Sequence, residues 1–136
     1  MGLFSKKVNY PELSEEHPAA KQIESIKVAL EELVGQVSDP LEVVPAVNHG
    51  YVFIGKPPKK FGIALLEEGT FKNFVALAKE KGLGNPQIFS VIESLGDAYK
   101  NNQDSERYKI EVAGKDVVVI PCPKLVAQIE QIVQSV

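Results

Sequence analysis

The sequence predicts an α+β fold in which a mostly antiparallel sheet of about five strands carries four packed helices. Apolar residues recur at intervals of three and four in some segments, which is typical of amphipathic helices. Elsewhere they alternate with polar residues or form short runs rich in β-branched residues, which is typical of strands. Glycine, proline and asparagine separate the strand-like runs by only a few residues, and such short connections favour hairpins.

The first predicted helix runs from about Pro18 to Val37. His17 suits the cap position, and Pro18 suits the first turn because its missing N–H has no helical partner there. The helix should end before Pro40, because the residue preceding a proline avoids the α region. Its apolar stripe consists of Ile23, Ile26, Leu30, Leu33, Val34 and Val37.

Three strands are predicted next, over 41–44, 51–54 and 61–66. Pro45 follows the first of them and cannot donate to a strand ladder, so this strand should lie at a sheet edge. Asn48-His49-Gly50 has turn chemistry because asparagine and glycine tolerate positive φ. The connection at 55–60 is rich in proline and lysine.

The second half of the chain predicts two helices, a hairpin and a last helix. Thr70 should cap a helix from Phe71 that stops at Gly82, and Asn85-Pro86 should begin the next. Strands are expected at 108–112 and 117–120, the latter buried on both faces, before a helix from Pro123. The resulting order is α-β-β-β-α-α-β-β-α.

The two halves share a weak α-β-β-α pattern, with Tyr51 to Ala78 resembling Tyr108 to Ile132 in pattern but hardly in residue identity. A duplication is therefore an open alternative. Residues 1–16 are polar and aperiodic and predict a flexible N-terminal arm, which leaves 17–136 as a single α+β domain.

Composition restricts the classes of function. The 136 residues carry a net charge of −3 and 44% hydrophobic residues, so a binder of nucleic acid is not favoured. One cysteine excludes an internal disulfide and a thiolate-rich zinc site. The first residues lack the apolar run of a signal peptide, and no run approaches the length that spans a membrane, so we expect a cytoplasmic protein without cofactor or membrane partner.

The connection Gly55-Lys56-Pro57-Pro58-Lys59-Lys60 is the first candidate site. Lys56, Lys59 and Lys60 would give a local positive patch able to hold a phosphate or nucleotide, and His49 is a further candidate binding residue. The competing interpretation is that prolines stiffen a hairpin end and lysines keep it soluble, which is the commoner role of such loops.

Cys122 is the second candidate site. It lies where a strand gives way to a helix, and a helix N-terminus stabilises a thiolate, so it could serve as a nucleophile. Catalysis would also need a base, and the chain has only His17 and His49. A small half-buried residue at the helix start is the more ordinary interpretation.

Three functions therefore stay open. The expectation we favour is a non-catalytic accessory or protein-interaction module that binds a partner or a second copy of itself. The last predicted helix carries only Lys124 and Glu130 as charges, which favours docking of its apolar face. The alternatives are a binder of a small anion at Lys56–Lys60, or a small enzyme with Cys122 as nucleophile.

Overall fold

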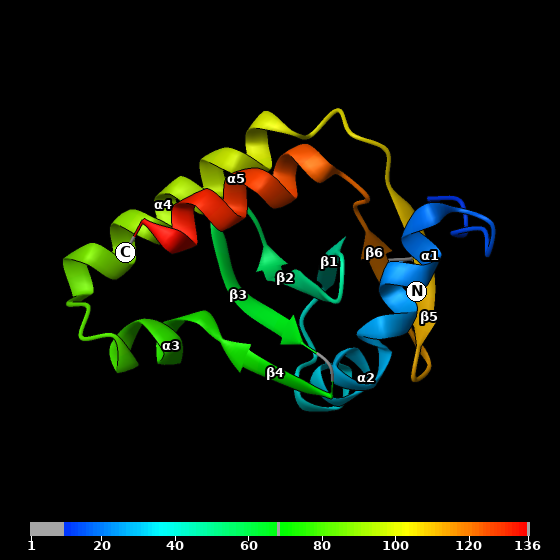
Figure 1. Ribbon diagram of the computed structural model, residues 1–136, viewed down its shortest axis with the longest axis horizontal. Helices are drawn as coiled ribbons and strands as arrows, with labels where there is room; N and C mark the ends of the chain where they lie inside the picture. The colour runs from blue at the N-terminus through cyan, green and yellow to red at the C-terminus, as the bar shows by residue number, and fades with distance from the viewer. Residues whose placement is uncertain (1–9, 68, 136) are drawn as a thin grey trace, which may run out of the picture.

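The computed structural model describes residues 10–67 and 69–135, which form a six-stranded mixed sheet and five helices (Figure 1). The α+β class is confirmed, and four of the five strand pairings among the described residues are antiparallel, whereas the expected five strands and four helices are corrected to six and five. The strand order across the sheet is β4-β3-β2-β1-β6-β5. The strands are β1 (Leu41–Ala46), β2 (His49–Lys56), β3 (Lys60–Glu67), β4 (Thr70–Asn73), β5 (Tyr108–Val112) and β6 (Lys115–Val119).

Helices cover both faces of this sheet. α4 and α5 lie side by side over one face, and α1 and α2 lie on the other (Figure 1). Over the described residues, no helix has the length and apolar character needed to cross a bilayer. The helices are α1 (Pro18–Ser25), α2 (Lys27–Gln36), α3 (Phe74–Glu80), α4 (Asn85–Asn101) and α5 (Pro123–Gln134).

A parallel pairing between β1 and β6 joins the two halves of the sheet. Glu42 lies opposite Val118 and Val43 opposite Val119, whereas the other four strand pairings are antiparallel. The prediction that the first strand lies at an edge is therefore wrong, because β1 has a neighbour on each side.

Pro45 is tolerated inside the sheet because of where its nitrogen points. Pro40 O accepts from Gly55 N–H, so even-numbered residues along β1 direct their backbone groups toward β2. Val43 O accepts from Ile120 N–H, so odd-numbered residues, Pro45 included, direct theirs toward β6. At Pro45 the strand β6 has already ended, and the Ile120 carbonyl accepts from Cys122 N–H at 2.9 Å instead. The missing donor of Pro45 therefore leaves no carbonyl of β6 unsatisfied.

The first helix is interrupted at Ile26, so the single helix expected from Pro18 to Val37 is wrong. Ser25 Oγ donates to Gln22 O at 2.7 Å, and the N–H of Ile26 bonds to the Ile23 carbonyl, which ends α1. Ile26 is fully buried, and a Cβ at Gly50 would lie only 2.8 Å from its Cδ1. The close approach of Ile26 to β2 therefore coincides with the break.

Residues Thr70–Asn73 form an edge strand, so the prediction that Thr70 caps a helix from Phe71 is wrong. Gly69 has a φ of 76°, which suits a tight turn, and Phe71 pairs with Leu66 of β3. The helix α3 begins three residues later than predicted, where Asn73 Oδ1 accepts the N–H of Val75 at 2.8 Å. The stop at Gly82, with a φ of 80°, is confirmed.

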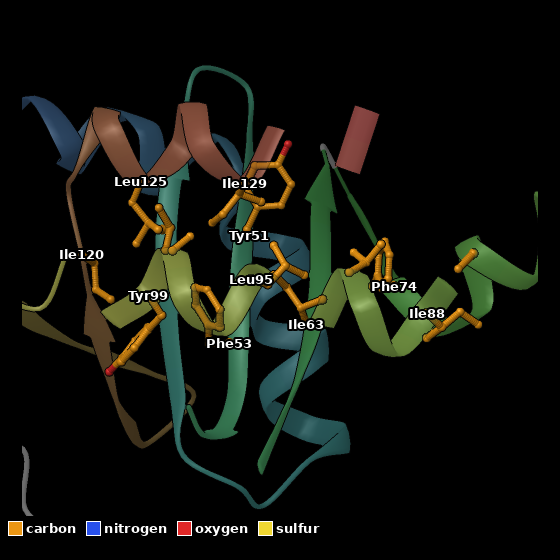
Figure 2. Close-up of a cluster of buried hydrophobic side chains, with 14 of the residues drawn as sticks. Tyr51, Phe53, Ile63, Phe74, Ile88, Leu95, Tyr99, Ile120, Leu125 and Ile129 are labelled. Carbon is orange, nitrogen blue, oxygen red and sulfur yellow. The ribbon is translucent and has the colours of Figure 1, made fainter. Parts of the chain in front are cut away.

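Alternating strand residues divide the core between the two faces of the sheet. Tyr51 and Phe53 point toward α4 and α5, while Val52 points toward α1 and α2. Figure 2 shows the first cluster, with Phe53 and Leu95 near its centre and the hydroxyls of Tyr51 and Tyr99 directed away from it. The predicted burial of 117–120 on both faces is confirmed.

Part of the predicted N-terminal arm follows β5. Pro11 O accepts from Lys109 N–H at 2.9 Å, and Leu13 N–H donates to Lys109 O at 3.0 Å. These bonds satisfy backbone groups on the outer side of an edge strand. Residues 1–9 lie outside the described part of the chain, so the mobility of the arm stays a prediction, as does the single-domain boundary at 17–136.

The turn between β2 and β3 packs on α4. A Cβ at Gly96 would lie 3.3 Å from Pro58 O and 3.4 Å from Phe61 Cε1, so there is little room there for a larger residue. Gly35 in α2 offers a contrast, because a Cβ there would meet nothing within 4 Å. Substituting alanine at each of these two helical glycines therefore separates the effect of helix propensity from the effect of packing.

We expect Gly35→Ala to raise the free energy of unfolding by up to about 1 kcal/mol, because alanine favours helix. Gly96→Ala should lack this gain or destabilise, because its methyl group presses on Pro58 and Phe61. Urea unfolding of both variants beside the wild type measures the difference. Equal gains in the two variants would contradict the tight packing of this turn on α4.

Candidate functional site

A groove of about 420 Å³ lies between α1, the end of β1 and α5. We call it the α1–α5 groove, and Pro18, Gln22, Val47, Cys122, Val126 and Glu130 mark its walls. Because β1 and β6 are parallel neighbours, both strands end beside this groove and α5 begins there. Its volume falls in the range of sites that hold a small ligand or a few peptide side chains.

Helical spacing explains how both walls arise. On α5, Cys122, Val126 and Glu130 are four residues apart and share one face. On α1, Pro18 and Gln22 have the same spacing. The walls are mostly apolar, and the charged residue of the lining is Glu130.

Glu130 is held from one side by two donors of β2. His49 Nε2 lies 2.6 Å from Glu130 Oε2, and Tyr51 Oη donates to the same oxygen at 3.3 Å. His49 Nδ1 lies 2.8 Å from Val47 O, so both ring nitrogens face acceptor oxygens. The contacts fix α5 to the turn between β1 and β2. Burial is the largest cause that raises the pKa of Tyr51 above its usual range, and the nearby Glu130 carboxylate is the second. Tyr51 therefore stays a hydrogen-bond donor.

His49 is the first residue of β2 and follows the turn at Val47 and Asn48. The structure places it against Glu130, a contact that the sequence did not predict. It does not lie beside Cys122. Cys122 and Glu130 are eight residues apart on one helix, which separates them by roughly 12 Å along its axis.

His17 lines the α1–α5 groove and caps α1, as predicted. Its Nδ1 accepts from Ala19 N–H at 3.0 Å, so the ring proton of the neutral imidazole resides on Nε2. The nitrogen that could take a proton is already used by the cap. This arrangement does not provide a ready general base.

Cys122 stands at the start of α5, as predicted, and lines the α1–α5 groove. In the hydrogen bonds of the described residues its Sγ donates to Asn102 Oδ1 at 3.6 Å. Asn102 is buried and also donates to Ala98 O and Gln128 Oε1, which ties the end of α4 to α5. A thiol that donates to an amide is a packing contact, and activation as a nucleophile would need a base at hydrogen-bond distance.

The three lysines of the connection after β2 are placed differently. Lys56 and Lys60 are direct partners across the β2–β3 ladder and line an open hollow of about 530 Å³ that Asp39 also lines. Lys59 is exposed and is not part of this lining. Two like charges placed opposite each other repel, and an anion between them would relieve this repulsion.

A second polar cluster joins β1 to α4. Tyr99 Oη donates to Glu42 Oε1 at 2.8 Å, Arg107 Nε lies 3.7 Å from the same oxygen, and the Arg107 guanidinium lies over the Tyr99 ring. Burial, followed by the hydrogen bond to Glu42, raises the pKa of Tyr99 to about 12. The cluster is enclosed and satisfied, so we assign it to stability.

A second hollow lies on the other side of the turn between β1 and β2. Glu24, Val28 and Asn48 line it, with a volume of about 550 Å³. Val47, which belongs to the turn, is 70% exposed, and Val28, which lines this hollow together with Asn48, is 58% exposed. We call the α1–α5 groove, this hollow and the turn between them the turn face.

Comparison with known proteins gives no match to a family model, to a curated protein or to a solved structure. Within residues 10–67 and 69–135, histidine, cysteine, aspartate and glutamate side chains form no cluster of three that could hold a metal ion.

Sequence reasoning missed the importance of Glu130 and Glu42. Glu130 had a visible signal, since it is the one acidic residue of α5, on the face that also carries Cys122 and Val126. Glu42 had a weaker one, an acidic residue inside an apolar strand segment. Their partners, His49 and Tyr99, are far away in sequence and carried no sign of the pairing.

We expect Tyr99→Phe to lower the free energy of unfolding at pH 8 by about 1–2 kcal/mol, because a buried hydrogen bond to a carboxylate is lost. The loss should shrink between pH 10 and 12. Unfolded tyrosine loses its proton near pH 10 while Tyr99 keeps it, so the contribution of Tyr99 is complete below pH 10 and declines as the pH rises toward 12.

Urea midpoints of wild type and Tyr99→Phe at pH 8 and pH 11 measure this change. Tyr10→Phe, which removes an exposed hydroxyl, controls for the substitution itself at pH 8. A difference between wild type and Tyr99→Phe that is the same at both pH values would rule out the raised pKa as its origin.

Proposed function

We propose that this protein is a non-catalytic interaction module that binds an apolar segment of a partner protein on its turn face. The observation that carries the proposal is that the exposed Val47 lines the α1–α5 groove, while the exposed Val28 lines the hollow to which Asn48 of the same turn contributes. Apolar surface gathered beside a concave site is typical of interaction surfaces.

A protein partner is favoured over a second copy of this chain on this face. The charged lysine, arginine, aspartate and glutamate residues that line the groove and the neighbouring hollow are Glu24 and Glu130, both acidic. A twofold contact of the turn face with itself would bring like charges together. Self-association through another surface stays open as a prediction.

The enzyme alternative has less support from the geometry. Cys122 donates its S–H to Asn102, and Nδ1 of His17 is occupied by the helix cap. The pair His49 and Glu130 lies about two helical turns away from the thiol. These groups are spread along the groove and do not converge on one reacting atom.

Selection of a random twelve-residue peptide library on the immobilised full chain tests the proposal. We expect related peptides with spaced apolar residues, and we expect Val47→Glu to weaken their binding at least tenfold, because a charge would replace an apolar contact. Phe89→Glu is the matched control, since Phe89 is also 70% exposed but belongs to α4 and not to the turn face.

Two results would refute the proposal. One is selection without any related family of peptides. The other is a family whose binding survives Val47→Glu but is lost with Phe89→Glu, which would move the interaction to α4. Circular dichroism of both variants establishes that they are folded.

A second candidate function has its own supporting observation, the opposed pair of Lys56 and Lys60 at one hollow. A small anion bound there would neutralise two facing ammonium groups, although Asp39 in the same lining opposes it. This is the anion-binding alternative that the sequence left open.

Thermal unfolding with inorganic phosphate and a panel of nucleotides tests this second candidate. An anion bound at this hollow should raise the midpoint, and the gain should disappear in Lys56→Ala and Lys60→Ala while Lys59→Ala keeps most of it. A midpoint that does not move with any of these anions, or that moves equally in all three variants, would exclude this site.

A further inference from the structure

We infer that the partner segment bound in the α1–α5 groove carries a lysine or arginine next to its apolar residues, and that Glu130 is the group that recognises it. This inference rests on the proposed function of the turn face and specifies the chemistry of its partner. It depends on how the carboxylate of Glu130 is held and on what else lines the groove.

The two oxygens of Glu130 are used unequally. His49 Nε2 and Tyr51 Oη both contact Oε2, at 2.6 and 3.3 Å. Within the described residues, Oε1 has no hydrogen-bond partner among the protein groups. The carboxylate is thus anchored through Oε2, and Oε1 is left to accept a hydrogen bond from a ligand. The Glu130 side chain is about one-third exposed.

Anchoring matters because it lowers the cost of binding. A free glutamate loses rotamer freedom when it pairs with a ligand, whereas Glu130 is already held by His49 and Tyr51 of β2. A charge-assisted hydrogen bond to a half-buried carboxylate is also stronger than one at an open surface. The groove therefore combines a mostly apolar lining with the carboxylate of Glu130, a hydrogen-bond acceptor whose position is already fixed.

The rest of the lining favours a cation over an anion. No lysine or arginine lines the α1–α5 groove, and the amide of Gln22 is a neutral group of its wall. Glu24, in the neighbouring hollow, adds negative charge to the same face. An ammonium or guanidinium group on this face therefore has Glu24 and the Oε1 atom of Glu130 as acidic partners, because His49 contacts Glu130 through Oε2.

The test repeats the twelve-residue peptide selection at pH 7.5 on wild type, Glu130→Gln and Glu24→Gln. Wild type should enrich peptides with a lysine or arginine at a fixed distance from the apolar positions. Glu130→Gln should enrich the same apolar pattern without the basic residue, because glutamine keeps the shape and loses the charge. Glu24→Gln controls for the general field and should keep the basic preference.

Affinities of one wild-type peptide complete the test. Replacing its basic residue with glutamine should weaken binding at least fivefold to wild type and less than twofold to Glu130→Gln. An equal loss with both proteins would overturn the role of Glu130, as would an equal basic preference in both selections. Absence of any apolar pattern with all three proteins would instead reject the proposed function, so the two failures are distinguishable.

Should Glu130→Gln prove unstable, Tyr51→Phe with His49→Gln gives a second measurement. This variant keeps the carboxylate but removes the anchoring Tyr51 hydroxyl and the histidine ring. We expect the basic preference to persist with a reduced affinity. Complete loss of the basic preference while the apolar pattern is kept would contradict recognition by Glu130 itself.

Discussion

The parallel pairing of β1 with β6 is the constraint on which the rest of the structure depends. It spans only two residue pairs, yet it joins a four-stranded part made from residues 41–73 to the hairpin of residues 108–119. Parallel neighbours end at the same side of a sheet. The start of α5 is therefore placed beside the end of β1, and the walls of the α1–α5 groove come from segments far apart in the chain.

The sheet also explains how polar groups become organised without a catalytic centre. Glu130 of α5 meets His49 and Tyr51 at the start of β2, and Tyr99 of α4 meets Glu42 of β1. Each of the two carboxylates accepts from at least one side chain of the layer packed against it. In both places a polar contact fixes a helix at a defined position on the sheet, and Glu130, which also lines the α1–α5 groove, uses only one of its two oxygens in that contact.

Local patterns were sufficient for most elements and for the sidedness of the core. The cap at His17, the stop at Gly82, the helix start at Asn85-Pro86 and the double burial of 117–120 follow from spacing and residue type alone. The break at Ile26 could not be predicted, because the apolar stripe of the two helices continues through it without interruption. The prediction of an edge position for the first strand is wrong because β6 ends before Pro45, and no residue within β1 indicates where its neighbour ends.

The candidate site was less accessible to sequence reasoning for a related physical reason. His49 and Cys122 were recognised as reactive residue types, but reactivity requires neighbours, and their neighbours come from other layers. His49 contacts a residue 81 positions away, and Cys122 contacts one 20 positions away. The residue with the clearest signal within its own element was Glu130, the one acidic side chain of an otherwise nearly uncharged helix.

The short bridge between residues 11–13 and β5 has a consequence for behaviour in concentrated solution. An open strand edge can pair with another chain and start the growth of ordered aggregates. On this side of the sheet, backbone groups near Lys109 are already occupied by a segment of the same molecule. The opposite edge is β4, only four residues long and followed at once by a helix. The fold thus offers little unpaired strand edge on which the sheets of two molecules could pair edge to edge.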